Sequence, residues 1–187
     1  MFNEILYFIL QIILPLIGMA FLLRAWFYAV RMPPFNPYSR AIFQVTDWAV
    51  QPIRKLVTPH KYVDLPSLLA TWLCAVVFLF GSWLLLSGTA LPVEYILKLL
   101  LAAVFTTIKW ALSTTLWLIL IQVILSWINP TAPAMPLLLA LTNPIMEPVR
   151  RRLPATGAID FSPLLVLLVL QVLSMVVQGV SFALLPI

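Results

Sequence analysis

The chain has 187 residues, of which 63% are hydrophobic and 9% are charged, whereas charged residues make up about 25% of an ordinary soluble domain. A soluble fold of this size cannot bury so much apolar surface, so we exclude a soluble globular protein, a disordered chain and a nucleic-acid-binding domain. The net charge of +5, from 11 Lys and Arg against 6 Asp and Glu, predicts orientation in a membrane and attraction to anionic lipid rather than nucleic-acid binding.

Four apolar segments are long enough to cross a bilayer, which needs roughly 20 apolar residues. They cover residues 5–30, 65–86, 101–128 and 161 to the end. The first has no basic stretch before it and no cleavage-site pattern, so we expect a retained span rather than a signal peptide. Two polar loops, 31–64 and 129–160, and a short linker, 87–92, connect these spans. The composition and spacing together predict an all-α membrane protein with four transmembrane helices.

The basic residues are distributed unevenly along the chain. The two polar loops hold Arg31, Arg40, Arg54, Lys55, Lys61, Arg150, Arg151 and Arg152, whereas on the other side we find only Lys98, beside Glu94 and Glu4. Because basic loops stay in the cytoplasm, we expect both loops there and both termini outside.

The two halves of the chain resemble each other at a shift of 96 residues. This shift places Arg54 on Arg150 and Asp64 on Asp160, and it also aligns Pro34 with Pro130, Thr46 with Thr142 and Pro52 with Pro148. We interpret the chain as two tandem helix–loop–helix repeats, 1–86 and 98–187, joined by a linker at 87–97. Each repeat crosses the membrane twice, so both have the same orientation.

Each loop also carries an apolar stripe with helical spacing. The stripes are Ile42, Val45, Ala49 and Ile53 in the first loop and Leu138, Leu141, Ile145 and Val149 in the second. They predict amphipathic segments at the cytoplasmic interface, although a packed loop whose stripe forms its own core would give the same pattern. We expect each segment to be broken, with Asp47 and Asn143 capping new turns and Pro52 and Pro148 kinking or ending the second piece.

Several motifs in the second repeat resemble the YggT family, whose chloroplast and cyanobacterial members are called YlmG. They are Leu125-Ser-Trp-Ile-Asn-Pro130, Thr142-Asn-Pro144, Pro148-Val-Arg-Arg-Arg-Leu-Pro154 and Asp160-Phe-Ser-Pro-Leu-Leu165. The first repeat is degenerate, with Val30-Arg31 for Ser-Trp and Trp48 for the proline after Asp47. The resemblance makes Asn129, Pro130, Asn143, Pro144 and Pro148 candidate contact residues.

This resemblance implies a small protein of the bacterial inner membrane without established catalytic activity. Family members are associated with assembly of membrane complexes or cytochromes, with division or nucleoid placement, and with osmotic or ion stress.

An arginine precedes an aspartate by ten residues in each loop, as Arg54 and Asp64 and as Arg150 and Asp160. One interpretation is a helix cap beside an arginine that reaches the lipid headgroups. The other is an ion pair that folds the loop back on the next span, and the two are compatible because a carboxylate has a spare oxygen.

Five loop cations are candidate ligands of anionic lipid headgroups, or they only set the topology. They are Arg54, Lys55, Arg150, Arg151 and Arg152. Lys109 lies in the third span among hydroxyl side chains, where an ionisable residue suggests function, unless it reaches the outer interface. For Arg24, near the cytoplasmic end of the first span, we expect an interfacial anchor.

The chain offers few groups for catalysis or metal binding. Cys74 is the single cysteine and His60 the single histidine, so we expect no zinc or thiolate site, no cofactor and no enzymatic activity. The sequence favours a non-catalytic assembly or scaffold protein that contacts anionic lipid and a membrane-protein partner. The alternative is a transport-related protein in ion or osmotic balance, suggested by Lys109, Pro15 and Gly18. The sequence does not fix the oligomeric state.

Overall fold

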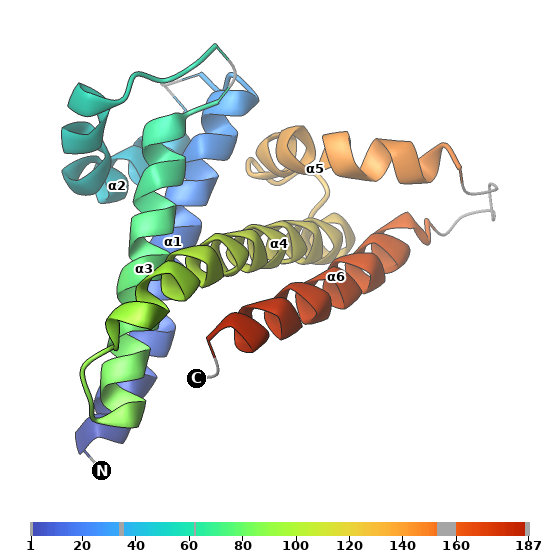
Figure 1. The fold of residues 1–187 in the computed structure, drawn as a ribbon. Coiled ribbons are helices and arrows are strands. Elements are labelled where there is room, and N and C mark those ends of the chain that lie inside the picture. Colours follow the sequence, from blue (N-terminus) through green and yellow to red (C-terminus); the bar gives the residue numbers. More distant parts are fainter. Residues whose placement is uncertain (1, 34–35, 62, 153–159, 186–187) are drawn as a thin grey trace. The chain divides into compact units, whose positions relative to one another are not determined.

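The computed structural model describes residues 2–33, 36–61, 63–152 and 160–185, and all regular elements among them are helical. Their order is α1 (Phe2–Ala29), α2 (Pro37–Leu56), α3 (Leu65–Ser87), the short 3₁₀ turn η1 (Val93–Tyr95), α4 (Ile96–Ile128), α5 (Met135–Arg150) and α6 (Ser162–Leu184) (Figure 1). The motif positions Pro34, Leu153 and Pro154 lie outside the described residues.

Four helices are long and apolar enough to cross a membrane, namely Phe2–Ala29, Leu65–Ser87, Val93–Ile128 with its 3₁₀ turn, and Ser162–Leu184. They match the four predicted spans, and the predicted all-α membrane architecture is therefore confirmed. The contacts divide the chain into two compact units, Met1–Ala111 with Val176–Ile187, and Leu112–Met175. α4 and α6 contribute to both units.

In the first unit, α1 packs along α3, and α2 packs on both helices. α2 lies where α1 ends and α3 begins, at the opposite end of this helix pair from the N-terminus (Figure 1). Small residues on α3, including Ala70 and Ala75, allow close packing against Phe21 of α1 and Val50 of α2. Gly18 has a packing role as well, because an added Cβ there would lie 2.3 Å from Cε3 of Trp110.

The second unit contains the later part of α4, α5 and most of α6. Its core joins Ile119 of α4, Met146 of α5, and Val166 and Leu170 of α6. In this unit, as in the first, a loop helix therefore packs by an apolar face on its neighbouring spans.

The predicted breaks in the loop helices are wrong. α2 continues through Pro52 to Leu56, and α5 continues through Pro144 and Pro148 to Arg150. Asp47 therefore lies inside α2 and caps nothing, and Asn143 lies inside α5. A proline leaves the carbonyl four residues earlier without its helical donor. All three prolines are on exposed faces, where these carbonyls can reach solvent.

The predicted apolar stripe of α5 is packed, since Leu138 and Leu141 are buried and Ile145 and Val149 are half-buried. In α2 the packed face is rotated from the prediction. Ile42, Ala49 and Ile53 of the predicted stripe are half-buried. The buried residues of α2, however, are Ser39, Thr46 and Val50, and Val45 is 61% exposed. The polar Ser39 and Thr46 were not part of the predicted stripe, and their burial moves Val45 to the outside.

Candidate functional site

Arg24 is the centre of a buried polar network in the first unit. Its side chain is only 4% exposed, and its Nη1 donates hydrogen bonds to Oγ1 of Thr46 at 2.8 Å and to Oδ1 of Asp47 at 2.6 Å. Its guanidinium carbon lies 5.0 Å from the ring centroid of Phe43, within the range of a cation–π contact. The prediction of an interfacial anchor is therefore wrong, because Arg24 is buried and bonds Thr46 and Asp47 of α2.

Asp64 occupies the capping position of α3, and its side chain has no exposed surface. Nη2 of Arg54 lies 3.4 and 3.3 Å from its two carboxylate oxygens, and Nε of Arg24 lies 3.9 Å from Oδ2. The predicted Arg54–Asp64 ion pair is confirmed. The predicted cap is not, because no backbone N–H donates to this carboxylate; the hydroxyl of Ser67 donates to it instead, at 2.6 Å.

This network joins three consecutive elements, α1, α2 and the start of α3. Its positive groups are not fully matched by acceptors, since the buried Nε atoms of Arg24 and Arg54 have no hydrogen-bond partner within the described chain. A buried donor without an acceptor costs about 1–3 kcal/mol. The first repeat therefore holds buried positive charge with spare donors.

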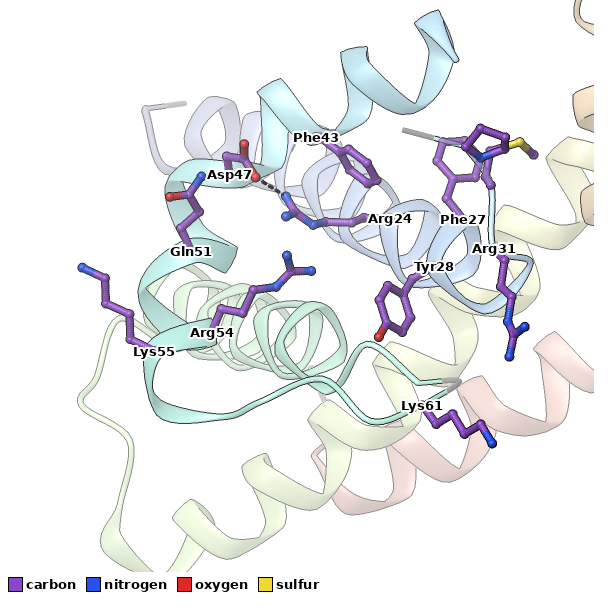
Figure 2. Close-up of a pocket in the computed structure, with 12 residues that line it drawn as sticks. Arg24, Phe27, Tyr28, Arg31, Phe43, Asp47, Gln51, Arg54, Lys55 and Lys61 are labelled. Atoms are coloured by element: carbon purple, nitrogen blue, oxygen red, sulfur yellow. Dashed lines mark hydrogen bonds and ion pairs between the residues drawn. The ribbon is translucent and has the colours of Figure 1, made fainter. Parts of the chain in front are cut away.

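A cavity of about 980 Å³ opens beside this network. Its wall contains one carboxylate, Asp47, and five cationic side chains: Arg24, Arg31, Arg54, Lys55 and Lys61. Figure 2 shows Arg24 turned toward Asp47 while Arg54 and Tyr28 point into the same space, and Lys55 and Lys61 extend away from it. The cavity is thus a basic site between the end of α1 and α2.

In the second unit the corresponding ion pair lies at the surface. Nε of Arg150 donates to Oδ2 of Asp160 at 2.8 Å, with side-chain exposures of 37% and 45%. The predicted pair is confirmed here too, and Asp160 also accepts from the backbone N–H of Ser162 at 2.9 Å, which caps the start of α6. Partial burial raises the pKa of Asp160, but hydrogen bonds from Ser162 and Arg150 and the charge of Arg150 outweigh it, so the net pKa is lowered from 3.8.

In both repeats the threonine of the loop helix is hydrogen-bonded to a side chain of the span before it, but that side chain differs. The hydroxyl of Thr142 in α5 bonds Oε1 of Gln122 in α4, and both residues are buried. Thr46, the counterpart of Thr142 in α2, accepts a hydrogen bond from Arg24 of α1. In each repeat a polar side chain of the first span is therefore bonded to the threonine of the loop helix, charged in one case and neutral in the other.

The other predicted contact residues lie mostly at the surface. Asn143, Pro144 and Pro148 are exposed on α5. Lys55 of α2 is exposed too, and so are Pro130 and Arg152 outside the helices. Asn129 shapes the turn after α4, because its Oδ1 accepts from the backbone and hydroxyl of Thr131. Arg151 pairs with Glu147 one turn earlier, at 3.1 Å.

Lys109 lies half-buried inside α4, roughly three and a half turns after Ile96. The neighbouring hydroxyls of Thr106 and Thr107 donate to carbonyls of their own helix, at Ala102 and Ala103. These two hydroxyls are therefore satisfied locally. Across the described ranges, no three His, Cys, Asp or Glu residues are grouped in a way that could hold a metal ion.

The sequence analysis gave Arg24 and Asp47 other roles, and it gave no role to Ser67 or Gln122. A signal for the first two was present in the repeat alignment. The 96-residue shift places Arg24 on Leu120 and Asp47 on Asn143, so the first repeat carries one positive and one negative side chain that the second repeat does not have. Such a paired difference is typical of an ion pair.

The family model described as CCB3/YggT matches residues 3–85 and 101–181. The chain belongs to the CCB3/YggT family. The double match agrees with two tandem repeats, and the predicted family resemblance is confirmed.

Among similar proteins, the uncharacterized protein YggT of Escherichia coli K12 is 32% identical over 184 residues, which cover 96% of this chain and 94% of that protein. An uncharacterized protein of Vibrio alginolyticus is 30% identical over 88% of each chain. One from Haemophilus influenzae is 30% identical over 87% of this chain and 85% of its own. No solved structure matches the chain.

Proposed function

We propose that the protein is a non-catalytic scaffold of the bacterial inner membrane. In this proposal α2 and α5 lie at the cytoplasmic face, where they contact anionic lipid and dock a membrane-protein complex. Two kinds of observation support the proposal: each loop helix is packed on its neighbouring spans, and the two loop helices expose different faces.

The observation that carries the proposal is an uncovered apolar face on α2. Tyr38, Val45, Trp48 and Leu56 are 39%, 61%, 69% and 87% exposed, and at 100° per residue they fall within an arc of about 80°. The packed face and the polar face of α2 lie elsewhere on the same helix. An interfacial helix needs such an apolar face for the leaflet or for a partner helix.

The way in which α2 is attached to its neighbouring helices supports a role in binding a partner. Arg24 bonds Thr46 and Asp47, and Arg54 bonds Asp64, so α2 is connected both to the span before it and to the span after it. A surface held in one position loses less conformational entropy when a partner binds.

α5 offers a different surface. Its apolar stripe is packed, and Asn143, Pro144 and Pro148 are among its exposed residues, followed by the arginines at 150–152. The proposal therefore gives the two loop helices different contacts: an apolar one for α2 and a polar, basic one for α5.

The transport alternative loses part of its support. Gly18 makes room for Trp110, and the hydroxyls of Thr106 and Thr107 are bonded within α4. Lys109 and Pro15 are the remaining features, and we carry the scaffold proposal forward.

Site-specific photo-crosslinking in intact cells tests the proposal. A photoreactive residue is placed at Trp48, at Asn143, or at Thr89 in the exposed linker that we expect on the outside. We expect discrete protein adducts from positions 48 and 143 and not from 89. The proposal fails if positions 48 and 143 give none, or if 89 gives the same adducts.

The orientation is tested by cysteine labelling in a Cys74→Ala background. Gln44→Cys and Thr131→Cys should be protected from a membrane-impermeant thiol reagent in intact cells, and Thr89→Cys should react. All three positions are exposed side chains, so protection reports the side of the membrane. Labelling of Gln44→Cys or Thr131→Cys from outside would contradict the cytoplasmic placement.

A further inference from the structure

The basic cavity beside Arg24 has more positive charge than its own acids can neutralise. Five cations and one carboxylate line it, although Lys55 and Lys61 extend away from its space (Figure 2). Asp47 is already bonded to Arg24 at 2.6 Å. Asp64, behind the wall, is occupied by Arg54 and Ser67. An anion that entered this space would therefore meet a net positive wall.

The same wall has hydrogen-bond donors without acceptors. Nε of Arg24 and Nε of Arg54 are both buried, and neither has a hydrogen-bond partner among the residues that the structure describes. Both atoms have almost no accessible surface, so a ligand in the cavity reaches them only after a side-chain movement. Arg54 points into the cavity together with Tyr28 (Figure 2), and its side chain is 38% exposed. Arg54 is therefore the accessible donor, and its charge favours an anionic ligand.

We propose that this cavity binds a phosphate group, carried either by an anionic phospholipid headgroup or by free phosphate. Guanidinium groups present several N–H donors in a planar fork that matches phosphate oxygens. A volume of about 980 Å³ is within the range of small-molecule sites, about 300–1,000 Å³, and leaves room for a headgroup beyond the phosphate itself. The inference rests on the proposed function and deepens it, since a bound headgroup would attach α2 to the leaflet.

The second repeat lacks the side chains for such a site. The 96-residue shift places Leu120 at the position of Arg24, Trp127 at that of Arg31, and Glu147 at that of Gln51. The shift also places Gly157 at the position of Lys61, so three of the five cations are absent, and a carboxylate stands where the cavity wall has an amide. The phosphate site therefore belongs to the first repeat. A single substitution, Gln51→Glu, introduces the carboxylate that the second repeat has at the same position and tests the site.

The test uses the purified full-length chain in phosphatidylcholine nanodiscs. Phosphatidylglycerol is titrated into the nanodiscs and its retention is followed by native mass spectrometry. In a separate arm, inorganic phosphate is titrated against a thermal shift, with chloride at matched ionic strength. The test variant is Gln51→Glu, which adds one carboxylate to the cavity wall. The matched control is Gln44→Glu, the same change two turns earlier on the same exposed face but outside the cavity.

We expect saturable binding of at least one probe to the unmodified chain. Gln51→Glu should weaken it about fivefold, the equivalent of ~1 kcal/mol, while Gln44→Glu should weaken it less than about twofold because screening limits its reach. Binding in the lipid arm alone identifies a headgroup, and binding in the phosphate arm identifies a soluble source. The inference is overturned if neither probe saturates, or if both variants weaken binding equally. If binding fails in this way while the crosslinks at positions 48 and 143 are still formed, the phosphate ligand is refuted and the scaffold proposal is not.

Discussion

Asp64 in the first repeat has no exposed side-chain surface, whereas its counterpart Asp160 in the second is 45% exposed. Both carboxylates pair with an arginine ten residues earlier. Around Asp64 the structure adds Arg24, and Asp47 is bonded to Arg24 in turn. Around Asp160 the described residues add, besides Arg150, a hydrogen bond from Ser162 at the start of α6. The comparison shows that one sequence motif attaches the loop helix in both repeats, while its surroundings decide whether it is a buried network or a surface contact.

Removing the carboxylate charge should give the largest difference in unfolding free energy between the two repeats. Asp64→Asn leaves Arg54 without a partner and takes the second acid from Arg24. We expect a loss of about 3 kcal/mol in unfolding free energy, the low end for breaking a buried ion pair, because Arg24 keeps Asp47. Asp160→Asn should cost no more than ~1 kcal/mol, since its pair is solvent-screened. Denaturant titration of the purified variants measures both losses, and equal losses would remove the distinction between the sites.

Converting the first site into the second tests the paired difference between the repeats. Arg24→Leu and Asp47→Asn install the residues found at positions 120 and 143. Each single change leaves a charged partner behind, so the double variant should be more stable than the sum of the two losses predicts. We expect a coupling of about 1–3 kcal/mol in a double-mutant cycle. Simple additivity would mean that Arg24 and Asp47 do not act as a pair.

Acid titration should give the smallest effect and should involve the second repeat. The pKa of Asp160 is lowered in the folded chain, so its stabilising contribution is present above the ordinary value of 3.8 and is lost as the pH falls through the folded value. The melting temperature of the unmodified chain should therefore exceed that of Asp160→Asn by a constant amount from pH 7 to about 5. This difference should disappear below the folded pKa. A difference that persists at the lowest pH would show that the charge of the Asp160 carboxylate is not what stabilises the chain.

The sequence predicted the four spans and both arginine–aspartate pairs. The spans follow from length and apolar composition, because a bilayer sets a narrow range for both. The pairs follow from the tandem repeat, which places the same two residue types at the same separation in two loops. Both inferences depend on properties that a sequence displays directly.

The errors arose where three-dimensional packing decided the outcome. Arg24 lies near the end of an apolar span, where an exposed anchor is the ordinary expectation, and only the fold shows that α2 covers it. The continuity of α2 and α5 through their prolines depends on which face each proline occupies. Thr46, which is buried in α2 and was not part of the predicted stripe, bonds Arg24 of another helix, and a sequence does not display such a contact. Comparing the two repeats residue by residue is the sequence observation that would have exposed the Arg24–Asp47 pair.

The central claim is that the first pair is embedded in a buried network while the second lies at the surface, and a charge swap tests it most directly. Arg150→Glu with Asp160→Arg should recover part of the stability that Arg150→Glu loses alone, because the exposed pair can form in either polarity. Arg54→Glu with Asp64→Arg should recover none, because an arginine at position 64 would face Arg24, whose Nε now lies 3.9 Å from the carboxylate. Denaturant titration of both swaps beside their single variants gives the answer. Recovery in the second repeat alone is the predicted result, and equal recovery in both repeats would contradict the account.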